Sequence, residues 1–179
     1  MTRRAVAAKW ILYCLCAAAL VLAQELLLVH LRLWGVHPFL LPAIAVIPVT
    51  LERSEQALIY AVFFGLVCDL LTPVQGLPCF YALAFLLGAA AAWLLSGQLI
   101  AAGLVCSLAV TAAATVLCGL LHLLVLSGQG HAASAGFLLL GKELAVSLPF
   151  AAAAHPLLRL VNRRMQENRR GTDHRRTGL

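Results

Sequence analysis

FGLVCDLLTPVQGL, residues 64–77, joins two strongly apolar runs and contains what a tight return between two helices requires. Gly65 permits close packing of the first helix, because a residue without a Cβ atom lets two helix backbones approach each other in lipid. Asp69 is expected to end that helix, and Pro73 with Gly76 are expected to form the turn. The stretch therefore predicts a helical hairpin.

The same alternation of apolar runs and short turns extends over all 179 residues, of which 63% are hydrophobic and only 11% charged. A soluble domain carries about 25% charged residues, so too little polar surface is left to cover a water-soluble core. A membrane-spanning helix needs about 20 apolar residues. The sequence predicts an all-α integral membrane protein, a bundle of about six transmembrane helices over residues 9–31, 38–51, 56–71, 77–95, 99–126 and 135–160.

The run at 38–51 contains Pro42 and Pro48, so two alternatives stay open for it: a kinked or tilted span, or a re-entrant segment. The run at 9–31 exceeds the apolar core of a cleaved signal peptide and is interpreted as an uncleaved span. We expect residues 1–160 to form a single transmembrane domain. The basic segment 161–179 is expected to be a disordered cytoplasmic tail.

Basic residues gather at both ends of the chain. Arg3, Arg4 and Lys9 precede the first apolar run, and seven of the thirteen basic residues follow Leu158. Because positive charge collects on the cytoplasmic side of a membrane protein, six crossings predict that both termini are cytoplasmic. Positive charge at the ends of apolar runs fits attraction to anionic membrane lipids and argues against nucleic-acid binding.

Stripes of small or weakly polar residues recur every three or four positions in several runs, which places each stripe on one helix face. Such stripes let helices approach closely in lipid, and we expect them to face the interior of the bundle. They consist of Ala57, Ala61 and Gly65; Ala84, Gly88, Ala92 and Ser96; and Gly103, Ser107, Thr111, Ala114, Cys118 and His122. A further stripe of Cys14, Ala18, Val21 and Glu25 is expected to turn Glu25 toward neighbouring helices.

Charged groups inside apolar runs cost at least about 2.5–3.5 kcal/mol at mid-membrane, so they mark positions of interest. With the predicted topology, Glu25, His122, Lys142 and Glu143 all fall in the outer half of the bundle and predict an outer polar cluster. We expect Lys142 to neutralise Glu25 or Asp69 across helices. The cluster is either a set of internal ion pairs that fixes helix register, or an outward-facing pocket or docking surface.

Sequence signatures of catalysis are absent: there is no GxSxG, HExxH, GxxxxGK[ST] or GxGxxG motif. The six cysteines contain no CxxC pair, and no two histidines have metal-ligand spacing. We therefore predict a protein that is not an enzyme, with no cofactor, no metal and no disulfide framework. His155 is the titratable residue of the inner half.

The stretch at 64–77 also resembles the signature of the MreD family of rod-shape-determining proteins: Gly-Leu-x-x-Asp-Leu-Leu, then Pro, then Gly-Leu at the start of the next helix. The chain length, the Pro-containing second run and the ending HPLLRL at 155–160 fit this resemblance, whereas the Ala-rich fourth and sixth runs depart from it. As motif positions and candidates for a partner interface, the resemblance covers Gly65, Asp69, Pro73 and Gly76.

The resemblance implies a non-enzymatic scaffold of the bacterial inner membrane. Its implied partner is the bitopic membrane protein MreC, in the machinery that directs lateral peptidoglycan synthesis. That machinery also contains MreB filaments and RodA with its penicillin-binding protein.

The MreD family is similar in fold to the S components of energy-coupling-factor vitamin transporters, which gives an alternative function. Ala19-x-x-x-Ala23 resembles the small-residue motif by which S components dock their coupling subunit. An S component also holds its ligand in an outward-facing pocket, where the outer polar cluster is expected. The short outer loops and the stretch at 64–77 favour the scaffold.

Overall fold

A computed structural model describes residues 3–52, 54–72, 77–98, 103–128 and 133–177, and the regular structure in this part of the chain is helical. A short 3-10 helix, η1 (Leu28–His30), follows the first of six α-helices. These six are α1 (Arg3–Leu26), α2 (Leu41–Glu52), α3 (Glu55–Leu71), α4 (Phe80–Gln98), α5 (Leu104–Gly128) and α6 (Ala133–Thr177). Each coincides with one of the six apolar runs, so the predicted all-α fold is confirmed.

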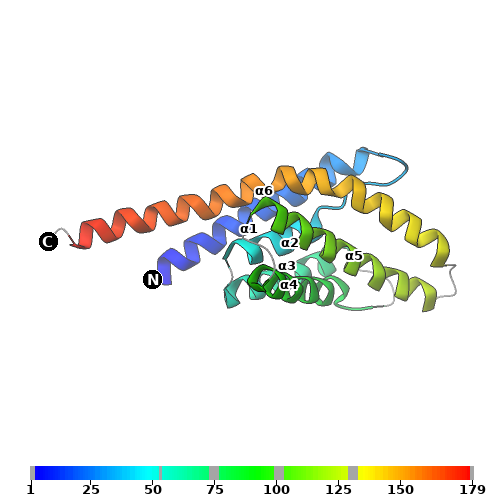
Figure 1. Ribbon diagram of the computed structural model, residues 1–179, viewed down its shortest axis with the longest axis horizontal. Helices are drawn as coiled ribbons and strands as arrows, with labels where there is room; N and C mark the ends of the chain where they lie inside the picture. The colour runs from blue at the N-terminus through cyan, green and yellow to red at the C-terminus, as the bar shows by residue number, and fades with distance from the viewer. Residues whose placement is uncertain (1–2, 53, 73–76, 99–102, 129–132, 178–179) are drawn as a thin grey trace.

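Successive helices alternate in direction, and both ends of the chain lie at the same end of the bundle (Figure 1). We call this the terminal end, and the other the distal end. Helix α3 packs on α4, α4 on α5, and α5 on α6, while α2 contacts all five other α-helices. The centre of the bundle is therefore α2, and the remaining helices surround it.

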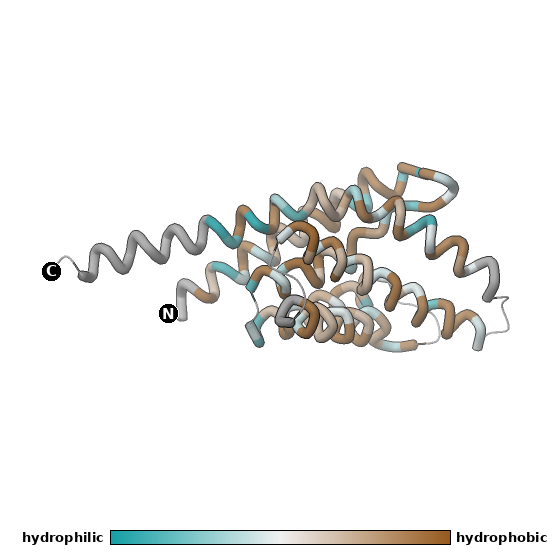
Figure 2. Tube along the Cα trace, viewed as in Figure 1, coloured by the Kyte–Doolittle hydropathy of each residue, from teal (hydrophilic) through white to brown (hydrophobic). Residues whose placement is uncertain are grey.

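Within the part of the chain that the structure describes, three helical stretches are long and apolar enough to cross a membrane: Val6–His30, Leu104–Gly128 and Gly136–Arg163. Hydrophobic residues cover most of the length of the bundle (Figure 2). Many large apolar side chains point outward, among them Leu70, which is 84% exposed. A surface this apolar suits lipid better than water.

Helix α2 is the most buried element, with every residue from Leu41 to Thr50 buried. Pro42 lies in its first turn, where an N–H group would have no acceptor within the helix, so the lack of one costs little. Pro48 lies inside the helix and cannot donate to the carbonyl oxygen of Ile44, four residues earlier. The hydroxyl of Tyr60 on α3 donates to that oxygen instead, at 3.4 Å. A side chain from another helix thus replaces the missing backbone donor, and the segment expected to be kinked or re-entrant contains a continuous 12-residue helix.

Helix α6 differs from the disordered tail that we expected at 161–179, because it continues through Thr177. The segment 163–170, RRMQENRR, consists mostly of residues with high helix propensity, which allows the last turns to follow on without a break. This part projects beyond the bundle beside the start of α1 (Figure 1). Within the bundle, Pro149 and Pro156 interrupt the hydrogen bonding of α6, which favours bending.

The small-residue stripes on three helices face the interior, as predicted. The buried members are Ala57, Ala61 and Gly65 of α3, Ala84, Gly88 and Ala92 of α4, and Ser107, Thr111, Ala114 and Cys118 of α5. Only the last member on α5, His122, is exposed, and the side chain of Ser96 lies outside the described residues.

The stripe predicted for α1 was wrong by one position. Cys14, Ala18 and Glu25 are exposed, whereas the adjacent residues Tyr13 and Gln24 are buried, as is Ala17. The reason is that the face of α1 that meets the bundle includes the ring of Tyr13 and the hydrogen-bonding amide of Gln24, which outweigh the preference for small residues at the contact.

The hydrogen bond between Tyr60 and Ile44 yields a first prediction. Tyr60→Phe should lower the free energy of unfolding by about 1 kcal/mol, because it leaves a buried carbonyl without a donor. In a Pro48→Ala background the same change should cost almost nothing, since residue 48 then has an N–H for Ile44. Unfolding of the detergent-solubilised protein measures both; equal losses in the two backgrounds would contradict the assignment.

Candidate functional site

Asp69 caps the helix that follows it. Its two carboxylate oxygens accept the backbone N–H groups of Tyr81, at 2.8 Å, and Ala82, at 2.9 Å, in the first turn of α4. The first N–H groups of a helix lack intrahelical acceptors, and the helix dipole favours a negative charge at this end. Asp69 does not end its own helix as expected, because α3 continues to Leu71.

Gly65 lies one turn before Asp69 on the same face of α3 and touches the same two residues of α4. A Cβ atom at Gly65 would lie 2.6 Å from the Cα of Ala82 and 2.7 Å from the carbonyl oxygen of Tyr81. Real Cβ atoms do not approach backbone atoms so closely, so glycine is required here. We call Gly65, Asp69, Tyr81 and Ala82 the α3–α4 clamp.

The clamp fixes both sides of the turn between α3 and α4. Pro73 and Gly76, the remaining motif positions, lie outside the described residues. Cys79, directly before α4, has a φ of 60°, a left-handed conformation that residues with a Cβ atom rarely adopt. Such strain persists where the surroundings hold it in place, and the paired N–H groups of the next helix supply that constraint.

The four residues of the predicted outer polar cluster do not form one connected site. Glu25 and His122 are exposed, while Lys142 and Glu143 are partly buried. All four belong to the described residues, and no hydrogen bond or ion pair joins any two of them.

Lys142 does not form the expected ion pair with Asp69 or Glu25, and the structure gives a reason for each of the two. Asp69 already binds two backbone amides, and Glu25 is turned outward from the bundle by the register of α1. His122 of α5 instead meets Phe80, the first residue of α4, edge to face with ring centroids 6.0 Å apart. Among the predicted cluster residues, His122 therefore packs beside the clamp.

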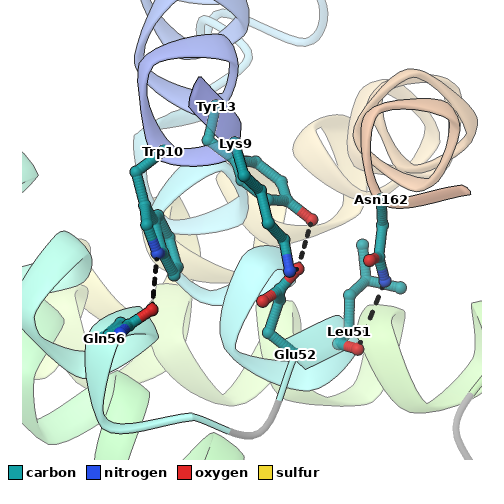
Figure 3. A network of polar contacts seen from close by, with 7 residues as sticks. All are labelled: Lys9, Trp10, Tyr13, Leu51, Glu52, Gln56 and Asn162. Atoms are coloured by element: carbon teal, nitrogen blue, oxygen red, sulfur yellow. Dashed lines mark hydrogen bonds and ion pairs between the residues drawn. The ribbon is translucent and has the colours of Figure 1, made fainter. Parts of the chain in front are cut away.

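A polar network that the sequence did not reveal ties four helices together at the terminal end (Figure 3). Lys9 of α1 forms an ion pair with Glu52 at the end of α2, and both side chains are largely buried. The hydroxyl of Tyr13 donates to the same carboxylate at 3.5 Å. Lys9 precedes the first apolar run and Glu52 follows the second, so antiparallel packing of the two runs could have predicted their meeting.

Two further hydrogen bonds extend this network to α3 and α6. The indole N–H of Trp10 donates to Oε1 of Gln56 in the first turn of α3, at 2.9 Å. The side-chain amide of Asn162 on α6 donates to the carbonyl oxygen of Leu51, near the end of α2, at 3.4 Å. The turn between α2 and α3 is thus held from both flanks (Figure 3).

A column of aromatic rings connects this network with the clamp. From Trp10, the rings of Tyr60, Phe64, Phe85 and Tyr81 follow one another with centroids 5.6, 6.1, 5.8 and 5.7 Å apart. Tyr60–Phe64 and Phe64–Phe85 are stacked pairs. Since each contact of this kind adds about 0.5–1.5 kcal/mol beyond buried area, the column joins the two ends of the bundle firmly.

The two residues directly before α2 are held by side chains from two other helices. Oε1 of Gln24 on α1 accepts the N–H of Leu40 at 2.9 Å, and Oγ of Ser147 on α6 accepts the N–H of Phe39 at 2.8 Å. Neither acceptor was identified from the sequence. Gln24 could have been recognised, because a lone glutamine inside an apolar run needs a hydrogen-bond partner in lipid.

The cysteines are free thiols, and no three His, Cys, Asp or Glu side chains among the described residues are placed to hold a metal ion. A scan against protein-family models, a search of curated proteins and a search of solved structures each find no match to this chain.

The clamp yields a second prediction. Gly65→Ala should force α3 and α4 apart and destabilise the protein by about 1–3 kcal/mol, the usual cost of overpacking. Gly141→Ala on α6 is the matched control, because nothing lies within 4 Å of an added Cβ there. Thermal unfolding in detergent compares the two; equal stability of both variants would refute the close contact.

The terminal network yields a third prediction. Lys9→Met should destabilise the protein by about 3 kcal/mol, because it leaves the carboxylate of Glu52 buried without its cation. The double variant Lys9→Met/Glu52→Gln should recover most of this loss, since the neutral amide still accepts the hydrogen bond of Tyr13. A double variant no more stable than Lys9→Met would show that the loss does not come from an unpaired carboxylate at Glu52.

Proposed function

We propose that this chain is a multi-pass protein of the bacterial inner membrane that acts as a non-enzymatic scaffold. It binds an MreC-like bitopic membrane protein and supports the machinery that directs lateral peptidoglycan synthesis. The observation that carries the proposal is the α3–α4 clamp. Gly65 and Asp69, two of the residues that carry the resemblance to the MreD family, are the two α3 residues that position the start of α4.

The proposed membrane placement follows from the helices and the charge. Each of the six α-helices is assigned to one crossing, and the terminal end, with Arg3, Arg4 and the seven arginines after Leu158, is assigned to the cytoplasm. The distal end then faces the periplasm. This placement puts the clamp at the outer surface, and the basic terminal end beside anionic lipid headgroups.

The clamp suits a docking function because it holds the end of α3 and the start of α4 in a fixed relation. A preorganised surface loses little conformational entropy on binding, which favours affinity. The partner proposed for this surface is the MreC-like protein. MreB, and RodA with its penicillin-binding protein, are proposed as further members of the same complex, without an assigned surface.

One observation favours the alternative function as an S component of a vitamin transporter. Ala19 is exposed on α1 and Ala23 is partly exposed, so the small-residue motif of this helix is open to a second membrane protein. In that function the motif would dock an ATP-driven coupling subunit.

The fourth prediction tests the scaffold in a rod-shaped bacterium that carries this gene. Depletion of the protein should make the cells round, and the wild-type chain should copurify with an MreC-like partner. Asp69→Leu should weaken that copurification strongly, because two amides at the start of α4 lose their acceptor and the start of α4 is no longer held against α3. Asp69→Asn, which retains one acceptor oxygen, should weaken it less, and Gly141→Ala should not weaken it.

Size-exclusion chromatography of each purified variant separates loss of binding from loss of folding. The S component becomes the better assignment if a vitamin copurifies at one per chain, or if a coupling subunit is recovered and Ala19→Leu abolishes its recovery. Rod-shaped cells after full depletion would contradict the scaffold.

A further inference from the structure

The connection between α1 and α2 folds into a compact loop at the distal end, over residues 27–36. After η1, the chain makes a tight hairpin in which Leu33 and Val36 exchange two backbone hydrogen bonds, at 3.0 and 3.1 Å. The two residues at its tip, Trp34 and Gly35, have φ angles of 55° and 83°. Positive φ at both central residues is the geometry of a two-residue hairpin turn.

Much of the backbone of this loop is paired internally. The N–H groups of Leu27, His30 and Leu31 bond to carbonyl oxygens three or four residues earlier, at 2.9, 3.3 and 3.0 Å. Backbone groups can enter an apolar layer only when they are satisfied internally. This internal pairing lowers the cost of placing the loop at the edge of an apolar layer.

The side chains of the loop divide into two sets. Leu28 and Val36 are buried against the bundle and hold the loop in place. The outward set is mostly apolar, and Trp34 at the tip is 74% exposed. The large exposed hydrophobic residues of the loop are Leu27, Val29, Leu31, Leu33 and Trp34.

Two cationic or titratable side chains are exposed among these apolar groups. They are Arg32 and His30, and residues 27–36 contain no acidic side chain. An exposed apolar surface with a cation and no acid is complementary to a lipid, which offers acyl chains beside a phosphate. Trp and Arg are also the residues that prefer the boundary between lipid and water.

The position of the loop agrees with such a boundary. The first apolar stretch able to cross a membrane, Val6–His30, ends inside the loop. The α-helical part of this stretch ends with α1 at Leu26, directly before the loop, and the 24 residues of α1 extend over about 36 Å, more than the about 30 Å of a hydrocarbon core. The loop lies at the edge of the bundle in Figure 1, on the side away from α3 and α4, where lipid would surround it.

We propose that residues 27–36 form an interfacial anchor that inserts into the headgroup region of the outer leaflet. Trp34, Leu31 and Leu33 contact the upper acyl chains, and Arg32 binds lipid phosphate. The inference rests on the membrane placement given under the proposed function and is independent of the protein partner.

The fifth prediction uses tryptophan fluorescence of the full-length chain in proteoliposomes. The contribution of Trp34 is the difference between the wild type and Trp34→Leu, a change that the exposure of this ring should allow without loss of folding. Lipids brominated near the headgroup should quench this contribution strongly, and aqueous iodide should quench it weakly. Trp93→Phe, the matched loss of a different tryptophan on α4, should leave the shallow quenching of Trp34 in place.

Arg32→Glu should reduce the quenching by shallow bromines and shift the emission of Trp34 to longer wavelength in anionic vesicles, whereas Arg32→Lys should retain both. Strong quenching of Trp34 by iodide and none by bromolipids would overturn the anchor. If the protein were not inserted in the membrane, iodide would also quench the contribution of Trp93, which is the difference in fluorescence between the wild type and Trp93→Phe. A failed anchor in an inserted protein would leave that signal shielded.

Discussion

A helix in the centre of an apolar bundle must have its backbone groups satisfied without water, and the neighbours of α2 supply several of the partners that its own hydrogen bonding cannot. It is buried from Leu41 to Thr50 and has a proline in its interior. The surrounding helices hold it in place: α1 and α6 bind the N–H groups of the two residues before it, and Tyr60 of α3 donates to the carbonyl that Pro48 leaves free. Asn162 of α6 binds a carbonyl near its end. These contacts come from α1, α3 and α6 and lie at different positions along α2. The position of α2 and the positions of these three helices therefore depend on one another.

The two ends of the bundle are fixed by different chemistry. At the terminal end an ion pair and long side chains from four helices meet, as Figure 3 shows. At the distal end one carboxylate and one glycine position the start of α4. The aromatic column lies between these two ends and passes through Tyr60, which also serves α2. The two ends are therefore connected by an unbroken series of packed rings.

Hydropathy alone predicted where the six helices lie. Each apolar run is many residues long, so no single residue decides whether the run is recognised. Spacing predicted the buried faces of α3, α4 and α5, where small residues mark close contact. It failed for α1, where Tyr13 and Gln24 define the contact and a one-residue error moves every side chain by about 100°.

Pairing of polar groups was predicted least well. The partner of Asp69 is a pair of backbone amides, which no side-chain pattern in the sequence announces. The expected pairing of Lys142 relied on charge alone, and charge does not specify which helices are neighbours at a given depth. The extension of α6 was missed because composition suggested a tail, whereas local helix propensity continues the last span.

The unequal lengths of the helices have a consequence for the surrounding bilayer. Helices α3 and α4 contain 17 and 19 residues and extend over about 26 and 29 Å, whereas α5, with 25 residues, extends over about 37 Å. In the placement proposed above, the hydrophobic thickness of the protein therefore changes around its circumference. Lipids beside α3 must compress while those beside α5 stretch or tolerate tilt, at a fraction of a kcal/mol for each ångström of mismatch. Such a gradient gives the protein a preferred side from which another short-spanning protein can approach, before any specific contact is made.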